Sequence, residues 1–495
     1  MEEKLNDQEI VRREKIKKLE ELGINPWGER FDRTDSSKSA KEKAQGKTNE
    51  ELEANPIYVT VAGRLMSARK MGKASFLNIQ DKEGRIQGYI SIDTVGLDSY
   101  NVFKMSDIGD IVGLYGRVML TRTGEVTIRV EKYTFLTKSL RVLPEKFHGL
   151  TDVEERYRHR YVDLIMNEDA KRVAILRPKI LRSMQHYFDN LGFMEVETSV
   201  LSPILGGANA RPFVTHHNAL NKDFYLRIAT ELQLKRLIVG GLEKVYEFGR
   251  LFRNEGMDTK HNPEFTTVEL YEAFGDLQSM RELCEGVIRN TCNEVLGTTH
   301  IPYGELEINF EDPFRWVSMA ELVKEKLGID FESDISFEEA KAFAESKGVH
   351  VEKHWTSNGY ILNALFEEFC EQDLVQPTFV HGHPIEVSPL TKKSADPRFT
   401  ERFELYINGT EYANAYSELN DPIDQRARFE AQLKAKELGD DEANEMDLDF
   451  LEALEYGMPP CGGIGIGFDR LVMLLTNEKS IREVILFPTM KDENK

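Results

Sequence analysis

The sequence predicts an α+β protein in which a small domain of short strands precedes a larger domain of helices and strands. Three observations lead to this prediction. The 495 residues suit two to four domains, since a domain usually holds roughly 100–200 residues. Short strand patterns follow one another between residues 56 and 145. Beyond residue 170, long helical patterns alternate with strands to the end of the chain.

Composition and cysteine usage exclude several classes of protein. Apolar residues make up 40% of the chain and prolines number 17, as in a folded chain rather than a disordered or collagen-like one. The four cysteines form no CxxC pair, which suits a reducing compartment. The charged N-terminus lacks the apolar core of a signal peptide, and apolar stretches such as Leu471–Leu475 are too short to span a bilayer. The sequence therefore predicts a cytoplasmic protein with no membrane partner.

Charge is distributed unevenly along the chain. The 64 basic and 85 acidic residues give a net charge of −21, which by itself disfavours a nucleic-acid partner. However, residues 55–145 carry 13 basic and 9 acidic residues, a net charge of +4, whereas residues 146–495 carry 39 and 62, a net charge of −23. A polyanion is therefore expected to engage the strand-rich domain first.

Residues 1–55 form an N-terminal segment ahead of the strands. Apolar residues recur at helical spacing over 5–22, and Gly23 and Pro26 end the pattern, which predicts an amphipathic helix. Its basic residues either lie along RNA or form a solvated charged face; they are Arg12, Arg13, Lys15, Lys17 and Lys18. Residues 35–55 are polar without periodicity, which indicates a linker or a frayed helix.

Residues 56–145 have the pattern of a small closed barrel. Five strand candidates are bounded by short turns, and a helical piece at 99–106 separates the third from the fourth. This order is typical of the oligonucleotide-binding (OB) barrel. The strand candidates are 57–66, 74–80, 85–92, 111–121 and 125–136.

Alternation within these strands predicts which side chains reach solvent. Leu77 and Ile86 belong to the inward-facing sets, so Phe76 and Gln87 face outward. A ring for stacking beside hydrogen-bond donors suits a single-stranded base. Arg85, like Gln87, lies opposite Ile86. An isolated surface aromatic is the alternative, but the nearby basic residues Arg64, Arg69 and Lys73 favour RNA.

The larger domain begins after a connector. Residues 146–170 are rich in arginine and tyrosine and form this connector, and residues 171–495 form the domain itself. Segment 171–203 reads as a helix followed by a strand that runs into Pro203. Residues 318–375 are helical, acidic and without obvious site residues, which indicates an insertion.

Two strand pairs carry most of the candidate site residues. In segment 243–272, period-two spacing places one set of side chains on the same face of the second strand: Phe265, Thr267, Glu269 and Tyr271. The preceding loop brings three polar residues near this face, namely Arg253, Glu255 and His261. In segment 403–418, the second strand of another hairpin presents Asn414, Tyr416 and Glu418 together.

The glycine-rich strand GGIGIGFDR, at 462–470, runs into a helix whose first turn holds Arg470. Such a turn alone is only a weak sign of a nucleotide site. Two arginines, Arg253 and Arg470, suit a polyphosphate that must be bent and neutralised, and Glu404 and Glu411 could share Mg²⁺ between them. Each residue also fits a surface ion pair or a solvated strand position, but their joint occurrence in order favours a site.

Taken in order, these motifs resemble those of the class II aminoacyl-tRNA synthetases. Three segments correspond to the signature motifs of that class: the helix and strand ending at Pro203, FRNE at 252–255 with its loop and HNPEF, and GIGIGFDR at 463–470. In the bacterial lysyl-tRNA synthetase family a proline often precedes Glu231, where this sequence has Thr230. Five further segments resemble that family, and the resemblance covers essentially the whole chain. They are GGANARPF (206–213), RNEG with HNPEFT (253–266), ELYEAF (269–274), NAYSELNDP (414–422) and ILFP (485–488).

The resemblance implies a fold, a reaction and partners. The larger domain would be a class II catalytic domain, an antiparallel sheet flanked by helices, in a homodimer joined around the first motif. The reaction would join L-lysine to tRNA(Lys) with ATP as a substrate and Mg²⁺, up to about three ions, as the cofactor. The barrel would read the anticodon of the tRNA.

The resemblance also implies roles for individual residues. The expected catalytic residues, which clamp the α- and γ-phosphates of a bent ATP, are Arg253 and Arg470. Further ATP contacts are expected from Glu255, His261, Asn262, Phe265, Glu404 and Glu411. Mg²⁺ is expected at Glu404, Glu411 and Glu418. The lysine substrate is expected to meet Gly207, Glu231, Glu269, Tyr271, Asn414, Tyr416 and Glu418. Anticodon contacts are expected from Arg69, Phe76, Gln87 and Glu125.

The lysine assignment has independent physical support. An ammonium side chain needs carboxylates, whereas an aspartate substrate needs arginine or lysine in the same place. Glu231, Glu269 and Glu418 supply several negative charges. The substrate's own carboxylate attacks the α-phosphorus, so the reaction needs no Ser-His-Asp or Cys-His set, and the sequence shows none.

Three other functions compete with this one. Aspartyl and asparaginyl enzymes share the architecture, but the acidic pocket and GGANARPF argue against both. A paralogue that modifies a protein instead of tRNA would lack the barrel. A non-catalytic RNA-binding protein on the same fold would be expected to have lost Arg253, Glu411 or Arg470, and all three are present.

Overall fold

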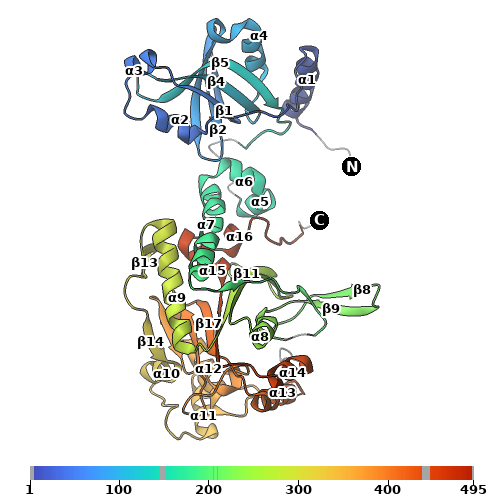
Figure 1. Ribbon diagram of the computed structural model, residues 1–495, viewed down its shortest axis with the longest axis vertical. Helices are drawn as coiled ribbons and strands as arrows, with labels where there is room; N and C mark the ends of the chain where they lie inside the picture. The colour runs from blue at the N-terminus through green and yellow to red at the C-terminus, as the bar shows by residue number, and fades with distance from the viewer. Residues whose placement is uncertain (1–4, 145–151, 205, 209, 438–445, 493–495) are drawn as a thin grey trace. The chain divides into compact units, whose positions relative to one another are not determined.

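The computed structural model describes residues 5–144, 152–204, 206–208, 210–437 and 446–492. The chain divides into two compact units, Met1–Gly149 and Leu150–Lys495. The boundary that the sequence predicts, between residues 145 and 146, lies outside the described residues. In Figure 1 the strands of the first unit are blue to teal, and the second unit runs from green through yellow to red.

The N-terminal unit is a closed five-stranded barrel with the order β1-β2-β3-β5-β4, which confirms the predicted OB-type barrel. Neighbouring strands are antiparallel, except that β3 and β5 run parallel where the barrel closes. Helix α4 (Ile92–Met105) connects the third strand to the fourth and begins earlier than predicted, directly after β3. The strands are β1 (Tyr58–Lys70), β2 (Ala74–Gln80), β3 (Arg85–Ser91), β4 (Ile111–Leu120) and β5 (Val126–Thr137).

The segment before the barrel is folded onto it. The sequence indicates a linker or frayed helix at 35–55, but the structure has two capped helices there, α2 (Ser37–Ala44) and α3 (Asn49–Ala54). Their apolar residues Ala40 and Leu52 belong to the barrel core. The pattern is hard to detect because each helix contributes only one or two apolar side chains.

Helix α1 (Asp7–Glu21) also packs on the barrel. Arg12 is buried and donates hydrogen bonds to the backbone carbonyls of Ile108, Ser139 and Arg141. Lys15 forms an ion pair with Asp107 at 2.6 Å. These two basic residues therefore anchor the helix, whereas Lys17 and Lys18 are exposed.

The barrel contains a buried ion pair whose loss is expected to destabilise it. Lys138 Nζ lies 2.7 Å from Asp110 Oδ1, and both side chains are almost fully buried. Replacing Lys138 by methionine leaves Asp110 buried without its cation, which costs about 3–5 kcal/mol. Urea unfolding of the full-length protein measures this, with the exposed Lys132→Met as control. Equal unfolding midpoints for the two variants would contradict the assignment.

The C-terminal unit is built on an eight-stranded sheet with the order β14-β15-β16-β17-β18-β11-β10-β6. The sequence implies an antiparallel sheet, and the central pairs are antiparallel, but the pairs at the two edges, β6–β10 and β14–β15, are parallel. The strands are β6 (Met194–Glu195), β10 (Lys244–Phe252), β11 (Glu264–Ala273), β14 (Arg315–Ser318), β15 (Thr378–His381), β16 (Arg402–Tyr406), β17 (Glu411–Ser417) and β18 (Cys461–Ile466).

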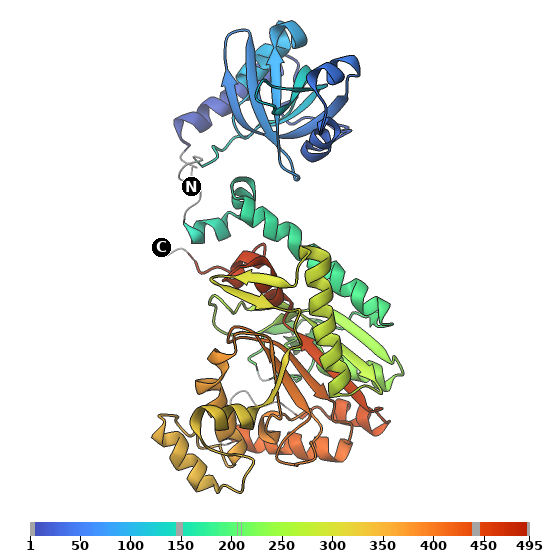
Figure 2. The ribbon, with the colours of Figure 1, turned by 90° about the vertical axis from the view of Figure 1, so that its left-hand side faces the viewer.

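One face of this sheet carries the hydrophobic core. Helices α7 (Glu168–Asn190), α9 (Leu277–Thr291) and α15 (Phe468–Thr476) pack there (Figure 2). Val268 and Leu270 of β11 point into this core, so Glu269 lies on the opposite face. The period-two prediction for β11 is therefore confirmed, and the opposite face is left for polar side chains.

The prediction of one continuous strand that runs into Pro203 is wrong in its extent. Only Met194–Glu195 pairs with the large sheet. The chain then turns away, and Leu201–Ser202 (β7) joins a separate three-stranded sheet with β8 (Val214–His217) and β9 (Lys222–Leu226). The switch occurs where Thr198 binds the Glu247 carboxylate instead of continuing the backbone ladder.

The remaining elements surround the sheet. The predicted insertion holds three helices, which share a second hydrophobic cluster with strands β14, β15 and β16: α10 (Met319–Leu327), α11 (Phe337–Ser346) and α12 (Asn358–Phe369). The others are α5 (Val153–Arg158), α6 (Arg160–Met166), α8 (Glu231–Val239), β12 (His300–Tyr303), β13 (Leu306–Asn309), α13 (Pro422–Glu437), α14 (Leu448–Glu455) and α16 (Ile481–Val484). Among the helices described, none has both the length and the apolar character needed to cross a membrane.

Candidate active site

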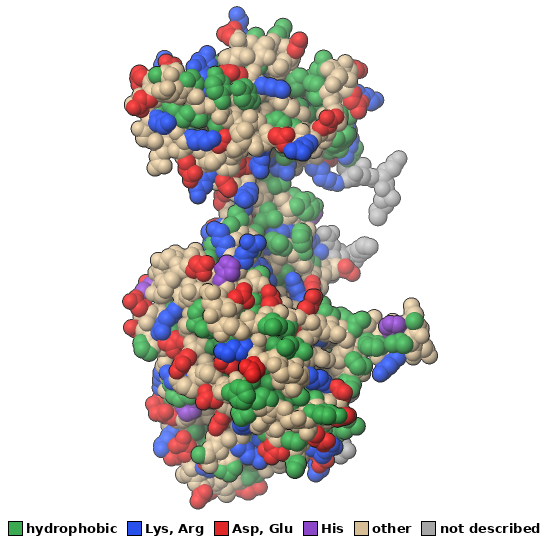
Figure 3. All heavy atoms as spheres, in the orientation of Figure 1, with side chains coloured by type: hydrophobic (Ala, Val, Ile, Leu, Met, Phe, Trp, Pro, Cys, Tyr) green, Lys and Arg blue, Asp and Glu red, His purple; other side chains and the backbone are tan. Residues whose placement is uncertain are grey.

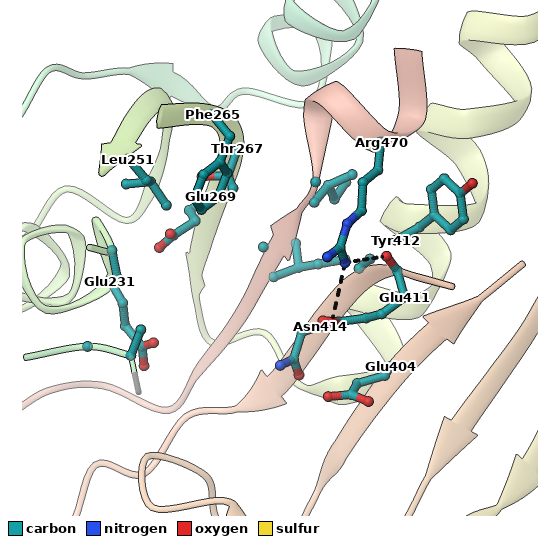
Figure 4. A pocket seen from close by; sticks show the side chains of 18 of the residues that line it. Glu231, Leu251, Phe265, Thr267, Glu269, Glu404, Glu411, Tyr412, Asn414 and Arg470 are labelled. Atoms are coloured by element: carbon teal, nitrogen blue, oxygen red, sulfur yellow. Dashed lines mark hydrogen bonds and ion pairs between the residues drawn. The ribbon is translucent and has the colours of Figure 1, made fainter. Parts of the chain in front are cut away.

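A cavity of about 440 Å³ lies over the polar face of the large sheet. Every residue that the sequence predicts for ATP, lysine or Mg²⁺ lines it. Figure 4 shows two groups of side chains across the cavity, with Glu231 and Glu269 on one side and Glu404, Glu411 and Arg470 on the other. The cavity therefore has an end rich in carboxylates and an end where arginines and carboxylates meet.

Two arginines define the second end. Arg253 follows β10, and its buried Nε has no hydrogen-bond partner in the described part of the chain. Its guanidinium lies 5.2 Å from the centre of the Phe265 ring. Arg470, in the first turn of α15, donates to the Glu411 carbonyl at 2.9 Å, and its Nη1 is 3.7 Å from Glu411 Oε2. Both guanidinium groups line the cavity, where they can bind an anion.

Glu404 and Glu411 form an acidic pair beside these arginines. Burial alone would raise the pKa of Glu404, but Arg402 and His383 lower it overall. The exposed part of Glu411, 40% of its side chain, faces the cavity, and this enclosure together with Glu404 raises the pKa of Glu411 to about 7. A divalent cation would relieve that repulsion, so the pair fits Mg²⁺.

Glu418 lies elsewhere. Its Oε2 is 2.5 Å from the ammonium of Lys235, and the side chain is fully buried. In the part of the chain that the structure describes, no group of three acidic, histidine or cysteine side chains is arranged to hold a metal ion. The structure therefore does not place Glu418 with Glu404 and Glu411 as a third metal ligand, because a lysine already neutralises it.

The loop between β10 and β11 supplies further polar groups. His261 is exposed, and its Nδ1 lies 2.9 Å from Asp258 Oδ2. Asn262 is buried, and its Nδ2 donates to the Glu264 carbonyl at 2.7 Å. Its Oδ1 has no partner among the described residues. These groups and the Phe265 ring surround a space that suits a flat heterocycle.

The acidic end is built from three carboxylates. Burial and the neighbouring Glu231 raise the pKa of Glu269 to about 7. Burial also raises the pKa of Glu418, to about 8, although Lys235 acts in the opposite direction. Burial is the largest cause of both shifts and the neighbouring carboxylates add to it, so a cation bound among these groups would lower both pKa values. This end of the cavity is therefore prepared for a cation.

Glycines allow the sheet to approach these groups. A Cβ on Gly463 would lie 2.0 Å from Glu418 Oε1 and 2.5 Å from the Tyr271 ring. No side chain fits at that position without displacing the carboxylate. The glycine-rich strand thus shapes the floor of the acidic end, which adds to its role of leading into α15.

Sequence reasoning missed two residues of the site. Arg402 donates to Glu404 and, at 3.1 Å, to Asn414 Oδ1. Lys235 binds both Glu231 and Glu418. The only sequence signal was the spacing, since Lys235 follows Glu231 by one helical turn and Arg402 shares a strand face with Glu404.

The predicted anticodon residues lie on the outer surface of the barrel. Arg69 pairs with Phe76 in the β1–β2 register. Gln87 donates to Glu125 Oε2 at 3.1 Å, so those two side chains contact each other. Tyr89, which was not predicted, places its ring 5.2 Å from that of Phe76. By contrast, the predicted Arg64 is engaged in binding the Gly109 carbonyl, and Arg85 binds Gln80.

Each of the two units matches a known protein family. Residues 59–136 match the family described as OB-fold nucleic acid binding domain. Residues 152–491 match the family of class II tRNA synthetases (D, K and N). The fold and the cavity together thus define a class II aminoacyl-tRNA synthetase with an OB-fold domain.

Relatives that match this chain along its whole length show which family of the class it belongs to. The chain is 57% identical over 490 residues to the lysine–tRNA ligase of Streptococcus gordonii, and the match covers 99% of both chains. It is 58% identical to that of Streptococcus pyogenes serotype M49, over 99% of both chains, and 57% identical to that of Lysinibacillus sphaericus, over 99% of this chain and 98% of the relative. The chain belongs to the lysine–tRNA ligase family, as the sequence motifs predict.

Proposed function

We propose that this protein activates L-lysine with ATP and transfers it to the terminal adenosine of tRNA(Lys). The single observation that carries the proposal is the division of one cavity into a carboxylate-lined end and an end where two arginines meet an acidic pair. Lysine fits the first end because its ammonium groups need acceptors. ATP fits the second because its phosphates need cations.

In the first step the lysine carboxylate attacks the α-phosphorus in line, and the bond to the β-phosphate breaks. Arg253 is placed to neutralise charge on the reacting α-phosphate, and Arg470 to hold the γ-phosphate of a bent ATP. Phe265 stacks on the adenine, and Glu255, His261 and Asn262 complete the contacts. When bound at Glu404 and Glu411, Mg²⁺ supplies further charge neutralisation on the phosphates.

The carboxylates select the amino acid. Glu231, Glu269 and Glu418 accept hydrogen bonds from the α- and ε-ammonium groups, while Gly207, Tyr271, Asn414 and Tyr416 complete the walls. An analogue without the ε-ammonium leaves buried acceptors unpaired, and such sites discriminate by about 10⁴-fold. The pocket thus reads the substrate by its charge.

In the second step a ribose hydroxyl of the tRNA attacks the lysyl-adenylate, and AMP leaves. The barrel selects the tRNA through Arg69, Phe76, Gln87 and Glu125, where a ring and polar groups lie side by side.

The four cysteines are unpaired thiols, which agrees with the cytoplasm, where tRNA is charged.

A homodimer is part of the proposal. Apolar side chains near the first motif are exposed, including Val200, Leu201 and Val214 at 39–59%. On the face shown in Figure 3, the projecting β8–β9 arm carries hydrophobic side chains. Exposed apolar surface of this kind marks protein interfaces, and sedimentation equilibrium tests for the dimer.

ATP–pyrophosphate exchange with each of the twenty amino acids, in the presence of Mg²⁺ and without tRNA, tests the proposed first step. Exchange with lysine alone is expected. Exchange with aspartate or asparagine would mean that the acidic end has been misinterpreted. Absence of exchange with any amino acid would favour a non-catalytic RNA-binding protein.

Lysine binding is expected to weaken as the pH falls. Because burial and Glu231 raise the pKa of Glu269 to about 7, this carboxylate gains a proton below that pH and no longer attracts an ammonium. The KM for lysine in the exchange reaction should rise roughly tenfold between pH 8 and pH 6. In the wild-type protein, log KM should fall as the pH rises. Glu269→Gln should make this slope shallower by up to about one log unit per pH unit, and an unchanged slope would exclude Glu269 as the titrating group.

Phe76→Ala is expected to impair tRNA recognition alone. Stacking a base on an aromatic ring contributes about 1–3 kcal/mol, so the KM for tRNA(Lys) should rise roughly 5- to 150-fold while lysine-dependent exchange stays unchanged. Tyr115→Ala, which removes another half-exposed ring from the barrel, is the control. Equal aminoacylation by both variants would place the anticodon elsewhere.

A further inference from the structure

A buried ammonium group stands behind the acidic end of the cavity. Lys235 is fully buried, and its Nζ lies 2.5 Å from Glu231 Oε1 and 2.5 Å from Glu418 Oε2. Both glutamates line the cavity, whereas Lys235 does not. The ammonium therefore holds two of the pocket carboxylates from the protein side, and the reaction as described makes no use of it.

The fold fixes this arrangement from several directions. Lys235 follows Glu231 by one turn of α8, and its Nζ lies 6.0 Å from the centre of the Tyr271 ring on β11. Glu418 is held just beyond β17, where its backbone N–H donates to the Cys461 carbonyl at 2.8 Å. The ionisable groups that surround the ammonium are Glu231, Glu269, Tyr271, Tyr416, Glu418 and Cys461.

The charges at this end can be counted. Glu231, Glu269 and Glu418 contribute three negative charges when ionised, and Lys235 contributes one positive charge. The remaining formal charge of −2 is equal in size and opposite in sign to the +2 of the two ammonium groups that free lysine brings, since its carboxylate reacts with ATP. Without Lys235, a third carboxylate would be buried with no cation to match it, which proteins avoid by taking up a proton.

We propose that Lys235 is a positioning and specificity-determining residue that sets the charge of the acidic end to match a substrate with two ammonium groups and aims Glu231 and Glu418 at them. The inference rests on the proposed function and deepens it. One oxygen of each glutamate is bound to Lys235, so the other is left for the substrate. An amino acid with a single ammonium group leaves one negative charge unmatched in the buried site.

Kinetics of lysine-dependent ATP–pyrophosphate exchange test the proposal, with four variants of the full chain. Lys235→Met is expected to raise the KM for lysine by about tenfold or more, with the KM for ATP within about twofold of wild type. Lys235→Arg keeps the charge and should recover part of the loss. The double variant K235M/E418Q restores the formal charge of −2 and should lower the KM for lysine relative to K235M.

Lys244→Met is the matched control. It also removes a lysine from a glutamate pair, since Lys244 Nζ lies 2.6 Å from Glu272 Oε1, but neither residue lines the cavity. Its KM for lysine is expected to stay within about twofold of wild type. A merely structural role of Lys235 predicts equal loss for K235M and the double variant.

Each outcome decides a separate point. A wild-type KM for lysine in K235M, or a double variant no better than K235M, would overturn the charge-matching role while the proposed function stands. If K235M does not fold, as judged by its thermal melt, the double variant carries the test alone. A double variant that binds ATP normally but lacks lysine-dependent exchange would then overturn the inference. Absence of exchange in the wild-type protein would overturn the proposed function itself.

Discussion

Replacing Arg253 by glutamine is expected to reduce lysine-dependent ATP–pyrophosphate exchange by roughly 10²–10³-fold, because this guanidinium neutralises charge that develops on the reacting phosphate. Removing one group of this kind from an enclosed site typically costs about 2.7–4 kcal/mol. The structure places Arg253 in the cavity with its buried Nε unpartnered among the described residues. The loss should appear mainly in kcat, since the interaction strengthens in the transition state.

The control for this prediction lies on the same strand. Arg250 of β10 is half-exposed, and its Nη1 lies 3.8 Å from Glu264 Oε2, away from the cavity lining. Arg250→Gln should leave the exchange rate within about twofold of wild type. Similar losses in the two variants would mean that Arg253 acts through general surface charge instead of contact with ATP.

Glu269→Gln is expected to produce the largest effect on lysine binding. The glutamine has the same shape and can still accept the backbone hydrogen bond that Thr230 donates to Glu269 Oε1 at 3.4 Å. It removes one charge from the acidic end, so the KM for lysine should rise roughly 30- to 150-fold, which corresponds to about 2–3 kcal/mol. The KM for ATP should change little, because ATP binds at the other end of the cavity.

Glu264→Gln is the matched control, since Glu264 begins the same strand with a side chain that is 40% exposed. It should bind lysine like the wild-type protein. Steady-state exchange at varied lysine and saturating ATP measures all these values. An unchanged KM for lysine in Glu269→Gln would show that the ammonium groups are held elsewhere in the pocket.

Much of the fold could be predicted because it depends on local patterns. The barrel strands were found within a few residues because each has clear alternation between turns, as with Leu77 and Phe76. The same alternation on β11 correctly separated Leu270, in the core, from Glu269, in the cavity. Backbone pairing at the sheet edges could not be predicted, since the parallel pairs β6–β10 and β14–β15 depend on segments far apart in sequence.

The site was predictable to the extent that its motifs carry a family resemblance. The residues predicted for ATP, lysine and Mg²⁺ all line the cavity, because Arg253 and Arg470 stand in recognisable motifs, whereas Arg402, which also lines it, was not predicted. Their roles remain proposals. Lys235 was missed because its spacing from Glu231 shows only that the two share a helix face, and nothing in the sequence indicates that Glu418 lies beside them. Buried partners of this kind become visible only when distances between elements are known.

Aminoacylation of unfractionated tRNA with all twenty amino acids present tests the choice of amino acid and the choice of tRNA together. The charged tRNA is sequenced and the esterified amino acid is identified. Lysine is expected as the amino acid and tRNA(Lys) as its carrier, since the acidic end and the barrel must both select correctly. Aspartate or asparagine on its own tRNA, or no charging by the folded protein with ATP and Mg²⁺ present, would contradict this expectation.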